Sequence, residues 1–227
     1  MAWRRPARDS LPARGPVRAG PGSRWRTVAS VSQGLPSTRQ RALIERHLDE
    51  LDRWTRRLNL TSVPRDRAWD RHVGETVALL DAADLAEGCR CADLGSGGGI
   101  PGVVVAVLRP DVSITLVESD RRKAGFLVHV CGLLDLANVS VAARRAEELG
   151  ADPVHHEAYD VVVSRAAAPP PLLWRLSAPL LRPGGTLWAL VSDADARSTV
   201  AALDRVTGVK AWSPAVGILA VRREAPG

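Results

Sequence analysis

The stretch CADLGSGGGIPG, at residues 91–102, decides the fold of this chain. An apolar run ends in the acid Asp93, a glycine-dense turn follows, and a helical apolar pattern then begins. Glycine adopts positive φ and lets the backbone approach a ligand closely, so this pattern predicts a cofactor-binding loop at the first strand-to-helix junction of an α/β domain. The next predicted strand also ends in an acid, Glu118, which favours this interpretation over an ordinary glycine-rich turn.

Predicted strands and helices alternate around this loop. Such alternation is typical of a doubly wound, mostly parallel sheet, here with seven strands. The last two strands are close enough to form an antiparallel hairpin, which is the distinctive addition to the fold. The predicted strands cover residues 89–94, 112–118, 138–142, 159–164, 186–191, 207–212 and 216–222, and the predicted helices cover 100–109, 120–135, 145–149, 170–181 and 194–205.

The chain divides into three predicted parts. Residues 1–36 are rich in Pro, Gly, Ser and Arg without periodicity, so we expect a disordered tail. Residues 37–84 form an N-terminal helical cap, and residues 85–227 form the α/β domain. The cap contains one helix after Ser37 and a second that begins near Pro64, where proline suits a first helical turn. Apolar residues at helical spacing define their faces, with Leu43, Ile44, Leu48, Leu51, Trp54 and Leu58 in the first and Trp69, Val73, Val77 and Leu80 in the second.

Charge is distributed unevenly along the 227 residues, whose formal net charge is +6. Residues 1–40 hold eight arginines against one acid, Asp9, so the remaining residues sum to −1. The basic character therefore belongs to the tail and not to the globular body. An arginine arm that binds RNA phosphates is one interpretation of this tail.

Three cysteines, Cys89, Cys91 and Cys131, provide neither a disulfide framework nor a zinc set, so we expect reduced, buried thiols in a cytoplasmic protein with no metal. No apolar run approaches the roughly 20 residues of a membrane span. The arginine-rich N-terminus has no apolar segment, which argues against a signal peptide. The sequence carries no indication of the oligomeric state.

The glycine run fits two ligand-binding templates. Gly97, Gly99 and Gly102 match the G-x-G-x-x-G pattern of dinucleotide-binding domains. Asp93, followed by Gly95, Gly97 and Gly99 at every second position, matches the acid-first loop of S-adenosyl-L-methionine methyltransferases.

Three features favour S-adenosyl-L-methionine over a nicotinamide dinucleotide. Asp93 lies at a strand end, where it can accept hydrogen bonds from an amino-acid moiety. A hairpin replaces the second mononucleotide-binding half, and Arg-Ala-Glu-Glu at 145–148 suits the bracketing of an adenine. Glu118 lies 19 residues after Gly99 and can bind a ribose diol in either class.

Several motifs together resemble the RsmG or GidB family, the bacterial 16S ribosomal RNA guanine-N7 methyltransferases. The resemblance spans about residues 40–192. Its most specific elements are Ile-Pro-Gly at 100–102 and Ser-Arg-Ala at 164–166. The other matching elements are Asn59-Leu60-Thr61, His72 with Glu75, the loop from Asp93 to Gly99, Glu118-Ser119, Arg122-Lys123, Phe126-Leu127 and Ala146-Glu147-Glu148.

This resemblance implies a class I (Rossmann-like) methyltransferase fold, S-adenosyl-L-methionine as cofactor, and 16S ribosomal RNA or the small ribosomal subunit as partner. It further implies that Gly95, Ile100, Ala146, Glu147 and Arg165 contact the cofactor, in addition to Asp93, Gly97, Gly99 and Glu118 from the loop pattern.

The sequence also departs from the family pattern. The family's Lys-Gly after the fifth strand is replaced by Val191-Ser192-Asp193. Glu75 stands for the usual aspartate, and Ala167 stands for a common aromatic residue. These departures concern the RNA substrate more than the cofactor.

The chemistry of N7 methylation fits a site without a general base. Guanine N7 carries a lone pair and no proton at neutral pH, so positioning of donor and acceptor provides most of the catalysis. No catalytic residue is therefore predicted. An arginine bonded to N7 would occupy the reacting lone pair, so we expect Arg165 to hold the methionine carboxylate, a phosphate or guanine O6. His72 is expected to be a buried, hydrogen-bonded structural residue.

Other functions remain open from the sequence. One is a methyltransferase of the same fold that acts on another RNA or a small metabolite. A second is a non-catalytic RNA-binding assembly factor, although Asp93, Glu118 and Glu147 are all present. A nicotinamide-dependent dehydrogenase is a more distant alternative.

Overall fold

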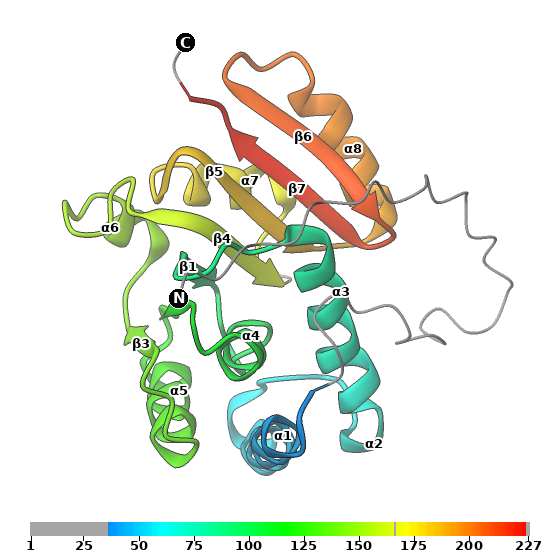
Figure 1. The fold of residues 1–227 in the computed structure, drawn as a ribbon, viewed down its shortest axis with the longest axis vertical. Coiled ribbons are helices and arrows are strands. Elements are labelled where there is room, and N and C mark those ends of the chain that lie inside the picture. Colours follow the sequence, from blue (N-terminus) through cyan, green and yellow to red (C-terminus); the bar gives the residue numbers. More distant parts are fainter. Residues whose placement is uncertain (1–35, 166, 226–227) are drawn as a thin grey trace, which may run out of the picture.

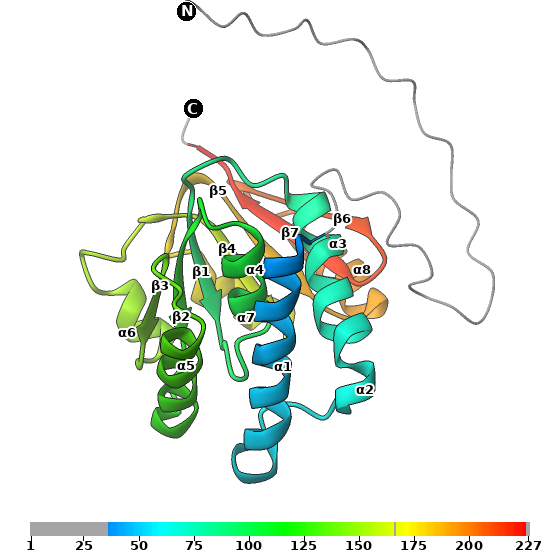
Figure 2. The same cartoon turned by 60° about the horizontal axis from the view of Figure 1, so that its bottom comes forward.

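The computed structural model describes residues 36–165 and 167–225. A seven-stranded sheet lies between two layers of helices (Figures 1 and 2). The strand order is β3-β2-β1-β4-β5-β7-β6. The predicted tail lies outside the described residues except for Pro36, and so does Ala166 of the Ser-Arg-Ala motif. The strands are β1 (Arg90–Leu94), β2 (Ser113–Val117), β3 (Val139–Ala142), β4 (Tyr159–Arg165), β5 (Leu181–Leu190), β6 (Val209–Ala215) and β7 (Ile218–Arg223).

The pairing of the strands confirms the predicted fold class. Strands β3, β2, β1, β4 and β5 are parallel, whereas β7 runs antiparallel to both β5 and β6. The central strands β1 and β4 are buried on both faces, as is typical of α/β proteins. Cys91 and Val163 point to one hydrophobic core, whereas Ala92 and Val162 point to the other. This period of two shows that the sheet separates two cores.

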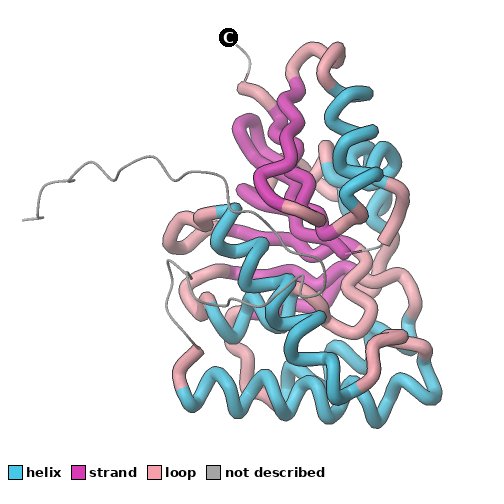
Figure 3. Tube along the Cα trace, turned by 90° about the vertical axis from the view of Figure 1, so that its right-hand side faces the viewer, coloured by secondary structure: helices cyan, strands magenta, loops and turns pink. Residues whose placement is uncertain are grey.

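The helices cover both faces of the sheet. Helices α1, α3, α4 and α5 pack on one core, and α6, α7 and α8 pack on the other. In the side view of Figure 3 the strands form one band with helices to either side. The helices are α1 (Thr38–Leu58), α2 (Arg65–Ala68), α3 (Gly74–Ala83), α4 (Gly102–Leu108), α5 (Arg121–Leu133), α6 (Ala146–Gly150), α7 (Pro170–Ser177) and α8 (Asp193–Leu203).

Helix α1 begins with a capping box that explains its start. The Ser37 hydroxyl accepts a hydrogen bond from the Gln40 backbone N–H at 3.2 Å, and the Gln40 side chain accepts one from the Ser37 N–H at 2.9 Å. The Gln40 amide also donates to the carbonyls of Val107 and Leu108 at 3.1 and 3.2 Å. One side chain thus satisfies the start of α1 and the end of α4 together.

The second cap helix differs from its predicted form. Between α2 and α3, residues Trp69–Val73 form a turn of π-helix, closed by a bond from the Gly74 N–H to the Trp69 carbonyl. The sequence pattern predicted one continuous helix, because an apolar face at 3.6-residue spacing does not reveal a single wider turn. Such turns occur frequently at functional sites, and this one contains His72.

Two further boundaries differ from the prediction. Strand β5 begins at Leu181, five residues before the predicted start, and its pairing with β4 is irregular between Leu181 and Thr186. Helix α7 ends at Ser177 and not near 181. The cysteines behave as predicted, because Cys89, Cys91 and Cys131 are free and buried.

Candidate cofactor site

The predicted site residues lie along one edge of the sheet. Strands β3, β2, β1 and β4 are parallel neighbours, so their carboxyl ends lie side by side. With about 4.8 Å between strands, the row spans about 14 Å. The strand order reverses between β1 and β4, which is where α/β folds bind ligands. Along this edge follow Ala146 and Glu147 after β3, Glu118 after β2, the glycine loop after β1, and Arg165 at the end of β4.

The loop after β1 folds back over the end of β2. The N–H groups of Gly95 and Ser96 both donate to the Val117 carbonyl, at 2.9 and 3.1 Å. Gly95, Gly97 and Gly99 have φ of 70°, 50° and 82°. All three angles lie in the left-handed region, where residues with a Cβ are strained. The alternate glycines of the motif are therefore required by the backbone.

Most glycines of this loop are also required by internal packing. A Cβ at Gly98 would lie 2.5 Å from Leu51 Cδ1 of α1, and one at Gly99 would lie 2.6 Å from Val103 Cγ2. A Cβ at Gly95 would overlap the Cβ of Ala167.

Gly97 is different, because a Cβ there would find only the Gly95 carbonyl oxygen, at 3.8 Å. The space outside the loop is open at Gly97. This is the position where the loop can accept a ligand against its main chain.

Glu118 connects the two loops that border this space. Its Oε2 accepts from the Gly97 N–H at 2.9 Å, and its Oε1 accepts from the Asp120 N–H at 2.8 Å. A carboxylate oxygen can accept two hydrogen bonds, so each oxygen of Glu118 retains capacity for a donor from a ligand. The position of Glu118 beside Gly97 is compatible with the predicted ribose contact.

Asp93 lies beneath the loop and is fully buried. Its Oδ2 accepts from the Gly102 N–H at 3.1 Å, which fixes the start of α4. Its Oδ1 is buried and has no hydrogen-bond partner within the described chain. Burial raises the pKa of Asp93 to about 7, against the opposing effect of the Gly102 hydrogen bond. In this structure the carboxylate organises the loop, and its contact with an amino-acid moiety stays a prediction.

Arg165 contacts the N-terminal cap. Its Nη1 donates to Nδ1 of His72 at 2.7 Å, and the same nitrogen lies 3.8 Å from Oε2 of Glu75. Because a guanidinium only donates, His72 is neutral with its proton on Nε2, and it donates to the Thr61 hydroxyl at 3.0 Å. Burial and the positive charge of Arg165 lower the pKa of His72 to about 3. The expectation of a buried, hydrogen-bonded His72 agrees with this geometry.

A second histidine was missed by the sequence analysis. His47 of α1 is fully buried, and its Nε2 donates to the Gly98 carbonyl at 2.8 Å. Burial lowers its pKa to about 4, so His47 is neutral at pH 7. Its position among Ile44, Leu48 and Leu51 on the apolar face of α1 was the available signal. This bond fixes the glycine loop to the cap.

The remaining predicted residues differ in their exposure. Ile100 is buried in the core between the loop and the cap helices. At the start of α6, Ala146 is half-buried and Glu147 is exposed, beside the end of β3. The structure brings Gly97 and Glu118 into contact and places the others along the same edge. Their contacts with a cofactor stay predictions.

A parallel sheet that ends in an antiparallel hairpin, with an acid-first glycine loop after its first strand, defines a class I methyltransferase fold. Two comparisons agree on the fold. An S-adenosyl-L-methionine-dependent methyltransferase-like protein of Methanococcus maripaludis has a TM-score of 0.54 at 12% identity, covering 81% of this chain and 94% of that chain. A variant of MtNAS in complex with S-adenosylmethionine has a TM-score of 0.55 at 13% identity, covering 82% and 76%.

The chain belongs to the GidB family, described as rRNA small subunit methyltransferase G, whose model matches residues 40–212. Relatives named ribosomal RNA small subunit methyltransferase G include one from Sorangium cellulosum, 42% identical over 153 residues and 66% of this chain. Another, from Roseiflexus castenholzii, is 41% identical over 153 residues and 66% of this chain. The matched region spans 63% and 64% of these two relatives' own lengths.

Within residues 36–165 and 167–225, no group of three or more His, Cys, Asp or Glu side chains is placed to hold a metal ion. In the same part of the chain no helix is both long enough and apolar enough to cross a membrane.

Proposed function

We propose that this chain is an S-adenosyl-L-methionine-dependent methyltransferase that modifies N7 of a guanine in 16S ribosomal RNA. The family and the fold support methyl transfer. The observation that carries the proposal is the open main chain at Gly97, held against the buried carboxylate of Glu118 at the switch point of the sheet. The resemblance to guanine-N7 methyltransferases supplies the acceptor atom.

The residues of the edge fit the parts of S-adenosyl-L-methionine. Glu118 would accept hydrogen bonds from the ribose hydroxyls, and Ala146 with Glu147 would border the adenine. Arg165, the half-buried last residue of β4, would hold the methionine carboxylate. The unpartnered Oδ1 of Asp93 beneath the loop supplies a buried acceptor near this end. When bound, this cofactor supplies an electrophilic methyl group on a sulfonium.

The protein's own contribution to this reaction is positioning. His72 and Glu75 fix the Arg165 guanidinium from the cap, and Thr61 fixes the tautomer of His72. The histidines of this region, His47 and His72, have pKa values lowered to about 4 and 3, so both are neutral and only weakly basic at pH 7. A target nitrogen that needs no deprotonation fits a site whose histidines are poor general bases.

The sheet argues against a nicotinamide-dependent dehydrogenase. Dinucleotide-binding folds continue with parallel strands in the order 3-2-1-4-5-6. Here the strand beside β5 is β7, which runs antiparallel and leads directly back from β6.

A methyltransferase acting on another RNA or a small metabolite is the second candidate, because Val191-Ser192-Asp193 replaces the family's Lys-Gly. Action on ribosomal RNA would take place in the cytoplasm.

Two measurements test the proposal. Calorimetric titration with S-adenosyl-L-methionine and with NAD distinguishes the cofactors, and we expect heat of binding only with the first. Mapping of N7-methylguanine in ribosomal RNA from cells with and without the gene tests the substrate. Unchanged methylation of the 16S RNA would exclude that substrate, and binding of NAD alone would exclude the reaction.

A further inference from the structure

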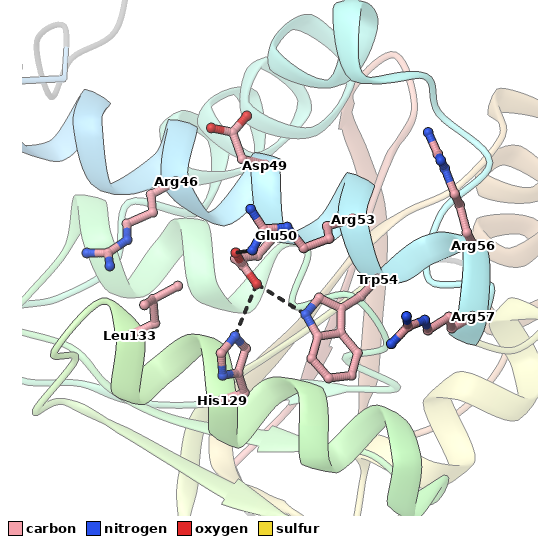
Figure 4. Close-up of a pocket in the computed structure, with 9 residues that line it drawn as sticks. All are labelled: Arg46, Asp49, Glu50, Arg53, Trp54, Arg56, Arg57, His129 and Leu133. Carbon is pink, nitrogen blue, oxygen red and sulfur yellow. Dashed lines mark hydrogen bonds and ion pairs between the residues drawn. The ribbon is translucent and has the colours of Figure 1, made fainter.

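A groove of about 740 Å³ lies between α1 and α5, and no residue of the glycine loop lines it (Figure 4). Most of its lining comes from one face of α1, and His129 and Leu133 of α5 form the opposite wall. Four arginines face this groove, against the two acids Asp49 and Glu50. This local net charge of +2 contrasts with the −1 of all residues after 40. The balance of charge is therefore more positive in this groove than over the body as a whole.

The arginines follow the helical repeat. Arg46, Arg53 and Arg57 are separated by seven and four residues, which places them on one stripe of α1. At 1.5 Å per residue, the stripe is about 16 Å long. Arg56 flanks it, and all four arginines are exposed. Such a row is long enough to contact several successive phosphates of a nucleic-acid strand.

The two acids of the groove are already engaged. Oε2 of Glu50 accepts from Trp54 Nε1 and lies 3.1 Å from His129 Nε2, and its Oε1 lies 2.9 Å from Arg53 Nη1. Burial raises the pKa of Glu50, but the bonds from His129, Trp54 and Arg53 outweigh it and lower the pKa. Asp49 is paired with Arg65 at 2.7 Å. These partners offset the negative charge, whereas within the described chain Arg46, Arg56 and Arg57 form no ion pair.

The groove leads to the candidate site. Helices α1 and α5 run antiparallel here, so Arg46 lies near the end of α5 and Arg57 near its beginning. The Arg57 carbonyl accepts a bond from Arg122 Nη2 at 3.3 Å. Helix α5 begins three residues after Glu118, and its cap Asp120 is bonded to that glutamate. A nucleic-acid strand that follows the arginine stripe would therefore reach the edge of the sheet beside Gly97.

We propose that the α1–α5 groove docks the phosphate backbone of the RNA substrate through the stripe of Arg46, Arg53 and Arg57. This inference rests on the proposed function for the presence of an RNA substrate. Phosphate contacts carry most of the affinity of such complexes and fix the position of the strand. The stripe thus supplies affinity and direction, while the edge of the sheet supplies the chemistry.

The test compares two double variants of the full chain with the wild type. Arg46→Gln with Arg57→Gln removes two exposed arginines from the groove. Arg67→Gln with Arg205→Gln removes two exposed arginines elsewhere and is the matched control. Binding of a fluorescein-labelled single-stranded RNA oligonucleotide of mixed sequence is measured by anisotropy between about 0.1 and 1 M monovalent salt. Thermal denaturation of each variant verifies the fold.

For single strands, each phosphate contact contributes about 0.7 to the slope of log affinity against log salt. Loss of two contacts therefore reduces the slope by about 1.4 and the affinity by about 25-fold at 0.1 M salt relative to 1 M. We expect this loss in the groove variant and wild-type behaviour in the control. Equal affinity and slope in the groove variant would overturn the proposal, as would an equal loss in the control.

Two further binding measurements, with S-adenosyl-L-methionine and with lipid vesicles, separate this inference from the proposed function and from a lipid ligand. S-adenosyl-L-methionine binding by the groove variant is expected to equal that of the wild type. Failure of the wild type to bind that ligand would refute the proposed function, and the anisotropy would still report on the groove. Vesicles of phosphatidylglycerol are the competing anionic surface. Groove-dependent binding to these vesicles, with no effect on RNA, would assign the stripe to a lipid surface and overturn the proposal.

Discussion

Substitution of Gly97 by alanine tests the candidate site directly. At φ of 50°, an alanine costs about 1–2 kcal/mol in backbone strain. The new Cβ meets no protein atom closer than the Gly95 carbonyl oxygen at 3.8 Å, so no steric overlap adds to this cost. For a domain of this size, the strain lowers the melting temperature by about 2–8 °C. We therefore expect Gly97→Ala to fold.

The cofactor response is expected to be lost in this variant. A ligand at 100 times its dissociation constant stabilises the folded state by about 2.7 kcal/mol, which raises the melting temperature by about 5–11 °C. The wild type should show this rise with S-adenosyl-L-methionine. The Gly97→Ala variant should not, because its methyl group occupies the open side of the loop.

Gly184→Ala is the matched control. Gly184 has φ of 83°, and a Cβ there finds no heavy atom within 4 Å. It lies near the start of β5, at the opposite edge of the sheet from the candidate site. The control carries a similar backbone cost and should retain the full ligand response. An equal rise in melting temperature for both variants would refute the assignment of Gly97 to a ligand surface.

Three further outcomes are expected. The pKa values of His47 and His72 are lowered to about 4 and 3, so between pH 6.5 and 4 these two side chains bind two more protons in the unfolded chain than in the folded chain. The pKa of Asp93 is raised to about 7, so in the same window its carboxyl binds one more proton in the folded chain and offsets one of the two. Stability measured by urea denaturation should therefore fall by about 1.4 kcal/mol per pH unit at most as the pH drops through this window; a flat profile would contradict these pKa directions. Gln40→Ala removes the side-chain half of the capping box and two bonds to α4, so circular dichroism should show a melting temperature about 4–8 °C lower, and an unchanged value would show that these bonds contribute little. Deletion of residues 1–36 tests the proposed boundary between the tail and the cap. It should lower the melting temperature by less than Gln40→Ala does, because Ser37, which supplies the cap of α1, is retained; aggregation of the shortened chain would argue against the boundary.

The arrangement of elements could be predicted from the sequence because it is encoded locally. Apolar periodicity marked the strands and most helices, and the acid-first glycine pattern marked the loop after β1. The hairpin at the end of the sheet followed from two short strands separated by few residues. The family followed from short motifs such as Ile-Pro-Gly at 100–102, which are also local. Helix boundaries were less accurate, since the π-turn at Trp69–Val73 leaves no periodic signal.

Only the tertiary structure separated the glycines by what surrounds them. The sequence does not reveal what surrounds Gly97, Gly98 and Gly99. The packing of Leu51 closes Gly98 and that of Val103 closes Gly99, whereas Gly97 is left open. The pairing of Arg165 with His72 joins residues 93 positions apart, and that of His47 with Gly98 joins residues 51 apart. The arginine stripe of α1 lines a groove only because α5 packs beside α1 in the folded chain. Periodicity determines which residues share a face, whereas the packing of distant elements determines what that face meets.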